Sequence, residues 1–355
     1  MSASPGPISA SNPLLMLAAF VVVVAGIKAA EELMVPFLLA AFLATIAATP
    51  VFWMARHRIP AGIAIAVVVA ALIAVLVGVG AVVASSVDDF REQMPFYGER
   101  LNVLVASGTA LALRLGIDLS EVSALDGLDP SGAFTLAGNV LAGFGNVLSN
   151  GFLILLTVIF ILGEASSFPA KLKAVLKVPE RDLPHFRRFA ENVNRYIAIK
   201  TAISAATGVV VWLAMWIIGV DFPALWGLLA FLLNYVPTIG SLIAAAPPVL
   251  LALVQLGAWH AAAVAAVFAV TNVGFGNVVE PRFMGRGLGL STLVVFLSLV
   301  FWGWMLGPVG MLLSVPLTMT LKIALEANPG TTWLALLLGP AVAVPADAPS
   351  DEASA

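Results

Sequence analysis

One apolar run near the C-terminal end of the chain constrains its fold more than any other stretch. Residues 287–321 form a run of 35 residues without one ionisable side chain. A continuous helix of that length would reach ~52 Å, whereas the hydrocarbon core of a bilayer is ~30 Å thick. The run is interrupted near its middle by Gly307-Pro308-Val309-Gly310, where proline removes a backbone donor and glycine tolerates a bend. We therefore expect this run to fold back as a hairpin.

Composition indicates an integral membrane protein. Apolar residues make up 61% of it and charged residues 10%, against ~45–50% and ~25% in soluble domains. The absence of cysteine excludes disulfides and cysteine-ligated metal sites. The sequence also has no GxxxxGK[ST] nucleotide loop, no metal-type cluster of His, Cys and Asp, and no basic run of the kind that binds nucleic acid. We therefore expect a non-enzymatic, all-α integral membrane protein without a cofactor, whose solvent is membrane lipid.

The pattern of apolar runs predicts about eight transmembrane helices. Six are predicted at residues 12–30, 33–54, 59–86, 146–163, 201–219 and 258–279, and the run at 287–321 supplies two more. We divide the chain into a three-span bundle (12–84), a small acidic extracytoplasmic helical insert (85–133), a fourth span with a basic cytoplasmic linker (134–200), a transport core (201–325) and a C-terminal tail (326–355).

A second overlong apolar run, residues 222–256, is also broken midway. Asn234-Tyr235-Val236-Pro237-Thr238-Ile239-Gly240 interrupts it, and Pro247-Pro248 follow. The loops 56–58, 171–200 and 282–286, with Lys322, hold 13 of the 17 basic residues, which places them and both termini in the cytoplasm. This orientation closes simply if 222–256 is a re-entrant hairpin, although two full spans stay an alternative.

The pattern around the two broken runs indicates an internal repeat of inverted topology. Each follows a span and an acid–proline junction, Asp221-Phe222-Pro223 in one and Glu280-Pro281-Arg282 in the other, and each has a proline after the break, as Pro316 is in the second. Secondary transporters place substrate sites at paired broken helices. The alternative is that glycine and proline are simply frequent in membrane helices.

Broken helices free backbone groups at membrane depth, which is tolerated where they line a cavity. We expect a polar pocket between the two breaks that suits a small, neutral, hydroxyl-rich solute. The candidate substrate-binding residues are the break residues and the nearest asparagines: Asn234, Pro237, Gly240, Pro247, Pro248, Asn272, Asn277, Gly307, Pro308, Gly310 and Pro316. The asparagines have an alternative role in helix–helix hydrogen bonding.

Carboxylates at span ends are the candidates for coupling or gating, because an intramembrane charge is expensive and therefore suspect. Glu280 is the first candidate for proton or cation coupling. The other coupling or gating candidates are Pro281 and Arg282 in the same junction and Asp221 in the junction of the first broken run. In the alternative interpretation Glu280 is an interfacial residue paired with Arg282 or Arg286.

These motifs resemble those of one transporter family. Val279-Glu280-Pro281-Arg282-Phe283-Met284-Gly285, Gly307-Pro308-Val309-Gly310, Ser314-Val315-Pro316-Leu317 and the break at 234–240 are similar to signatures of the autoinducer-2 exporter (AI-2E) family. The resemblance covers roughly residues 12–325, with one departure at Ser291-Thr292, where the family often has His-Pro.

The resemblance implies a bacterial inner-membrane transporter and a homo-oligomer, a pentamer in the family. Family members resemble exporters of the quorum-sensing signal autoinducer-2, and some act as sodium/proton antiporters. Three functions therefore stay open: export of a small polar solute, sodium/proton antiport, and a non-transporting membrane scaffold. The lack of a mid-span carboxylate speaks against antiport, and the costly broken helices speak against a scaffold.

Overall fold

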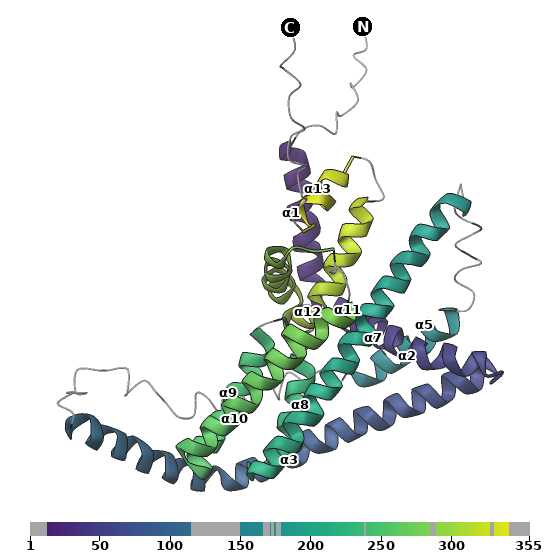
Figure 1. Ribbon diagram of the computed structural model, residues 1–355. Helices are drawn as coiled ribbons and strands as arrows, with labels where there is room; N and C mark the ends of the chain where they lie inside the picture. The colour runs from purple at the N-terminus through teal and green to yellow at the C-terminus, as the bar shows by residue number, and fades with distance from the viewer. Residues whose placement is uncertain are drawn as a thin grey trace, which may run out of the picture.

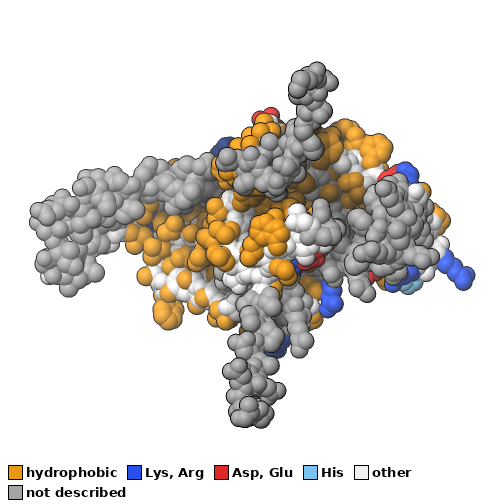
Figure 2. Space-filling view, turned by 90° about the horizontal axis from the view of Figure 1, so that it is seen from above, with side chains coloured by type: hydrophobic (Ala, Val, Ile, Leu, Met, Phe, Trp, Pro, Cys, Tyr) orange, Lys and Arg blue, Asp and Glu red, His pale blue; other side chains and the backbone are white. Residues whose placement is uncertain are grey.

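The computed structural model describes residues 13–114, 150–165, 171, 174, 179–237, 239–284, 289–326 and 330–340. Every regular element in these ranges is a helix (Figure 1). Six helices are long and apolar enough to cross a membrane, and three shorter apolar helices accompany them. Hydrophobic side chains cover broad areas of the visible surface (Figure 2), and large ones such as Ile217 and Trp259 are exposed. The predicted all-α membrane protein is confirmed.

The N-terminal region consists of three helices in sequence. α1 (Pro13–Ala29) and α2 (Glu31–Arg56) follow the first two predicted spans and are separated by one residue. α3 (Ala61–Arg114) is 54 residues long, about 81 Å of helix. It therefore runs on through the boundary expected at residue 85, and the first part of the predicted insert continues span 3. The remainder of that insert and the start of span 4 lie outside the described residues. The next described helix is α5 (Gly151–Ala165).

α7 (Pro179–Ile218) is the axis of the C-terminal half. Its 40 residues join part of the predicted basic linker to span 5 in one helix. α8 (Pro223–Leu233) packs against it where two glycines meet. A Cβ atom added to Gly208 or to Gly227 would lie 2.8 Å from the other's carbonyl oxygen, so this close crossing requires both glycines.

α8 and α9 (Ile239–Leu256) form the first hairpin, broken where the sequence predicts. Gln255 closes its open end, because its Oε1 accepts from the Asp221 amide at 3.1 Å and its Nε2 donates to the Gly219 carbonyl at 3.2 Å. α8 has 11 residues, about 16 Å of helix, which is too short to cross the hydrocarbon core. This length favours the re-entrant form over two full spans.

α12 (Thr292–Glu326) contains the second hairpin. Leu306 and Gly307 leave helical geometry, and Gly307 has φ 62°, a value that favours glycine. The arms pack together, because Trp302 Nε1 donates to Thr318 Oγ1 at 3.0 Å. Lys322 Nζ donates to the Gly289 carbonyl at 2.6 Å and ties the open end. The predicted fold-back of this run is confirmed.

The two hairpins occupy different parts of the molecule (Figure 1). The first lies in the lower half of the view, with its open end beside the lower end of α7. The second lies in the upper half, beside α1 and α13 (Thr332–Leu337). Its break lies near Lys28 at the lower end of α1, whereas its open end is bound to the α13 segment through Ser291 and Leu338.

The span expected at residues 258–279 is not one regular helix. α10 (Ala258–Thr271) changes into a π-helix, η2 (Asn272–Val279), before the short α11 (Glu280–Met284). Two glycines within η2 weaken α-helical preference, and Pro281 just after it has no amide hydrogen to donate. π-Helical turns are rare in proteins, and those that occur often lie at functional sites.

Candidate functional site

One buried stripe on α7 organises the polar interior. Lys200, Ser204, Thr207, Val211 and Met215 are all buried. Their spacing of three or four residues places them on a single helix face. The last two members of the stripe are apolar and pack in the core around the first hairpin, whereas the first three are polar. The polar part faces the break of that hairpin and the end of η2.

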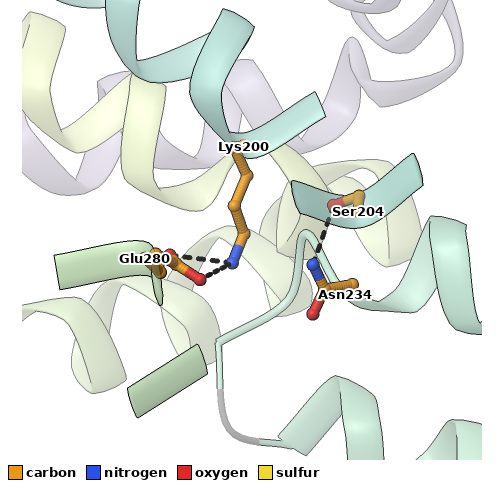
Figure 3. Close-up of polar contacts among 4 residues, drawn as sticks. All are labelled: Lys200, Ser204, Asn234 and Glu280. Carbon is orange, nitrogen blue, oxygen red and sulfur yellow. Dashed lines mark hydrogen bonds and ion pairs between the residues drawn. The ribbon is translucent and has the colours of Figure 1, made fainter. Parts of the chain in front are cut away.

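Lys200 holds Glu280 in a buried ion pair (Figure 3). Its Nζ lies 2.9 Å from Oε1 and 2.8 Å from Oε2 of Glu280, and the side chains are 6% and 20% exposed. The alternative interpretation pairs Glu280 with Arg282 or Arg286; Arg282 is exposed, and Arg286 lies outside the described residues. The pairing with Arg282 is wrong because α7 places a lysine against the carboxylate from 80 residues earlier in the chain.

The first break is tied to α7 one turn further along. Asn234 Nδ2 donates to Ser204 Oγ at 2.9 Å (Figure 3), and Tyr235 Oη donates to Thr201 Oγ1 at 2.7 Å. Tyr235 also packs edge-on against Phe42 of α2. The residues of the break are therefore held by side chains where no regular backbone ladder is available.

A small cavity lies beside this break. It has a volume of about 10 Å³, room for a single water molecule. Its polar lining comes from α7, the break, α9, the end of α10 and the start of η2: Thr207, Asn234, Ser241, Thr271 and Asn272. The structure thus brings together Asn234 and Asn272, two predicted site residues. Thr207 Oγ1 is fully buried and has no hydrogen-bond partner.

Both breaks depend on a glycine pressed against the opposite arm. A Cβ atom on Gly240 would lie 1.9 Å from the Leu233 carbonyl oxygen, and one on Gly310 would lie 1.9 Å from the Trp302 carbonyl oxygen. Such distances are impossible without movement of the backbone. The predicted glycines therefore set how closely the arms of each hairpin approach.

Charged residues of the α1–α2 turn reach the second break. Lys28 Nζ donates to the Trp304 carbonyl at 2.9 Å and to Glu31 Oε2 at 2.6 Å. A Cβ atom on Gly307 would lie 3.5 Å from Glu31 Oε1. Nothing local in the sequence indicates this contact, because Lys28 and Trp304 are 276 residues apart.

Apolar side chains join the two hairpins. Tyr235 of the first break belongs to the same buried cluster as Val309 and Leu313 of the second hairpin. The small polar cavity described above lies between the first hairpin, α7 and α10, and the pocket expected between the two breaks stays a prediction. The residues that line the small cavity include none from the second hairpin, so Gly307, Pro308, Gly310 and Pro316 stand apart from it.

The remaining predicted residues occupy distinct places. Pro247 and Pro248 lie inside α9, where Pro248 is buried. Asn277 is exposed on η2. Asp221 lies at the open end of the first hairpin, where Tyr97 of α3 donates to its Oδ2 at 2.7 Å. The next residue, Phe222, has φ 58°, a left-handed conformation that is uncommon for an aromatic residue.

The sequence missed Lys200, Ser204 and Thr207 as site residues. The predicted basic linker ends at Lys200, and the predicted span at 201–219 contains Ser204 and Thr207 without a role for either. A signal was present: the stripe through Met215 and Val211, continued toward the N-terminus at helical spacing, meets all three. Among the described residues, no group of His, Cys, Asp and Glu could hold a metal ion.

Comparison with known proteins gives one consistent family. The model of the AI-2E family transporter matches residues 17–330. The AI-2 transport protein TqsA of Escherichia coli strain K12 is 43% identical over 325 residues, which cover 92% of this chain and 94% of that protein. Putative transport protein YhhT of the same strain is 39% identical over 327 residues, with 92% and 94% covered. A putative transport protein of Haemophilus influenzae is 41% identical over 332 residues, with 92% and 95% covered.

Proposed function

Because the chain belongs to the AI-2E transporter family, we propose that it is a secondary transporter that exports a small polar solute of the autoinducer-2 type across the bacterial inner membrane. The family and the apolar helices make it a membrane transporter. The solute is supported by the name of TqsA, the relative at 43% identity. Secondary transport is favoured because the sequence carries no nucleotide-binding loop.

The observation that carries this proposal is the polar face of α7 against a broken hairpin. Unwound backbone and a buried ion pair are costly inside a membrane protein, so their retention at one place points to function. Here Lys200 and Ser204 lie one turn apart on α7. Lys200 binds Glu280, and Ser204 accepts a hydrogen bond from Asn234 of the break (Figure 3). A scaffold has no need of this arrangement.

Glu280 is the proposed coupling residue. Glu280 is the residue that follows the π-helix η2, and its carboxylate binds Lys200. A proton or a cation that competes for the carboxylate would break this ion pair between α7 and the end of η2. Loss of that contact would free the end of α10 to move relative to α7. The basic part of α7 would lie on the cytoplasmic side, in line with the distribution of lysine and arginine.

The test uses proteoliposomes of the purified full chain. Labelled autoinducer-2 flux and sodium-driven change of internal pH are recorded separately, under inward and outward proton gradients. Glu280→Gln should lower solute flux about tenfold or more, the factor that ~1.4 kcal/mol of lost interaction gives. Glu326→Gln is the matched control, because Glu326 is an exposed carboxylate that also pairs with a lysine, Lys322, at 3.4 Å; it should transport like the wild type.

Each outcome has a distinct meaning. Solute flux that depends on Glu280 supports the exporter. Sodium-dependent proton movement without solute flux would replace the exporter with an antiporter that uses the same carboxylate. Equal solute flux in Glu280→Gln and the wild type would remove Glu280 from the mechanism. No transport of either kind by an inserted, folded wild type would favour the scaffold.

A further inference from the structure

We propose that the cavity beside the first break is a binding site for one small monovalent cation of sodium size. It would be coordinated by neutral oxygens of Thr207, Thr271, Ser241 and Asn234. Its role as a coupling ion rests on the proposed transport function, whereas its binding can be measured without transport.

The first observation that supports a bound cation is the unpartnered hydroxyl of Thr207. A threonine within a helix ordinarily donates to a carbonyl one turn earlier, as Thr201 does to Ile197 and Thr157 does to Leu153. Thr207 Oγ1 is fully buried, makes no such bond, and lines the cavity. A buried polar group without a partner is destabilising unless something absent from the protein chain completes it.

The lining selects a single-atom ligand. A cavity of about 10 Å³ has room for one water molecule or one desolvated ion. It has no room for a polyhydroxylated solute, so this cavity is not the binding site of the exported molecule. None of the described residues that line it is charged, which disfavours a divalent ion, because calcium and magnesium sites are built on carboxylates.

The available atoms favour a cation over an anion. Asn234 uses its amide nitrogen on Ser204, which leaves its carbonyl oxygen for a ligand (Figure 3). The first amides of α9, those of Ile239 and Gly240, already donate to the carbonyls of Pro237 and Val236. An anion would therefore find few free donors at this helix start, whereas a cation finds several hydroxyl and amide oxygens.

The second break provides an internal precedent. There the ammonium of Lys28 donates to the Trp304 carbonyl, in the last turn before the break. The corresponding turn of α8 ends beside the cavity, where Ala230 is one of the lining residues. The nearest ammonium on α7, that of Lys200, is already bound to both oxygens of Glu280. A diffusible cation at the first break would take the part that Lys28 plays at the second.

The experiment measures binding of ²²Na⁺ to the purified full chain, together with thermal unfolding in sodium, potassium or choline chloride at equal ionic strength. We expect about one sodium per chain and a sodium-specific rise in melting temperature of ~2 °C or more. Thr207→Val keeps the shape and removes the hydroxyl, so it should abolish both signals. It should still be as stable as the wild type in choline, because it removes an unpaired buried group.

Thr157→Val is the matched control, because it makes the same change on α5, away from the cavity, and should keep both signals. Thr271→Val tests the site from α10 and should lose them, which gives a second reading if Thr207→Val folds poorly. Unchanged sodium binding in both cavity variants, or equal responses to sodium, potassium and choline in the wild type, would overturn the site and leave a water-filled cavity. Sodium binding without solute flux would overturn the proposed function and keep the site.

Discussion

Asn234 fixes the first break by donating to Ser204, a residue with no exposed surface, whereas Lys28 fixes the second by donating to the Trp304 carbonyl from a partly exposed turn. Both breaks use a glycine against an opposing carbonyl. They differ in what completes the interrupted backbone: neutral, buried groups at one, and an ammonium with its own carboxylate at the other.

The difference shows which break can respond to a small ligand. The second break carries its cation covalently, on the side chain of Lys28, paired with Glu31. The first break lies beside a cavity whose lining includes an unpaired hydroxyl, that of Thr207, and no charged group. We therefore expect the second hairpin to act as a fixed element and the first as the adjustable one. Three groups of substitutions test this comparison.

The largest effect should come from filling the glycine contacts. Gly240→Ala and Gly310→Ala each place a methyl group 1.9 Å from a backbone carbonyl oxygen, which forces the arms apart. Overpacking costs typically 1–3 kcal/mol, and a rigid backbone neighbour puts these two changes at or above ~3 kcal/mol. Thermal unfolding of the purified variants measures the loss.

Gly78→Ala is the control for these variants, because a Cβ atom there meets nothing within 4 Å. It should unfold at or slightly above the wild-type temperature, since alanine favours the helix. Normal stability in either hairpin variant would show that its arms are not held together at that point. A loss in one variant alone would mean that the two breaks are not built alike.

The next effect should come from removing the buried lysine. Lys200→Ala leaves the Glu280 carboxylate largely buried without its partner, and breaking a buried ion pair in this way costs about 3–5 kcal/mol. The exposed fraction of Glu280 and entry of water will hold the loss near the lower end of that range. Unfolding monitored by tryptophan fluorescence, compared at equal salt, gives the change in stability.

A double variant separates the pair from general packing. Lys200→Met with Glu280→Met replaces both charges by apolar chains of similar length, so it should recover most of the stability lost by Lys200→Ala. Failure to recover would mean that Lys200 stabilises the fold through contacts other than Glu280. The double variant should still lack coupled transport, since the proposed coupling carboxylate is gone.

Sequence reasoning recovered the features that are local along the chain. The breaks at Asn234–Gly240 and Gly307–Gly310 follow from proline and glycine chemistry, and both are present. Contacts between distant segments could not be read in this way. Lys28 and Trp304 are 276 residues apart and Lys200 and Glu280 are 80 apart, and neither spacing leaves a periodic signal.

The π-helix and the long α3 escaped prediction for a related reason. A composition shift near residue 85 indicates a change of solvent, but a helix can continue through such a shift without ending, as α3 does. An apolar run such as 258–279 predicts a helix but does not register whether its hydrogen bonds reach four or five residues back. The candidate site was therefore predicted in part: Asn234, Asn272 and Glu280 were identified, and their partners on α7 were not.

The smallest effect should come from the lysine at the second break, which makes this variant the sharpest test of the contrast. Lys28→Ala removes a partly exposed pair with Glu31 and one bond to the Trp304 carbonyl. Exposed pairs contribute about 0–1 kcal/mol, and water can replace the lost donor, so we expect a loss of ~1 kcal/mol or less in the same unfolding assay. Glu31→Gln, which keeps the lysine on the carbonyl, should cost less again. If Lys28→Ala instead destabilises the protein as much as Lys200→Ala, the second break is sealed from water like the first. The two hairpins would then differ only in which residue supplies the positive charge. The inference that the first hairpin is adjustable and the second fixed would be wrong.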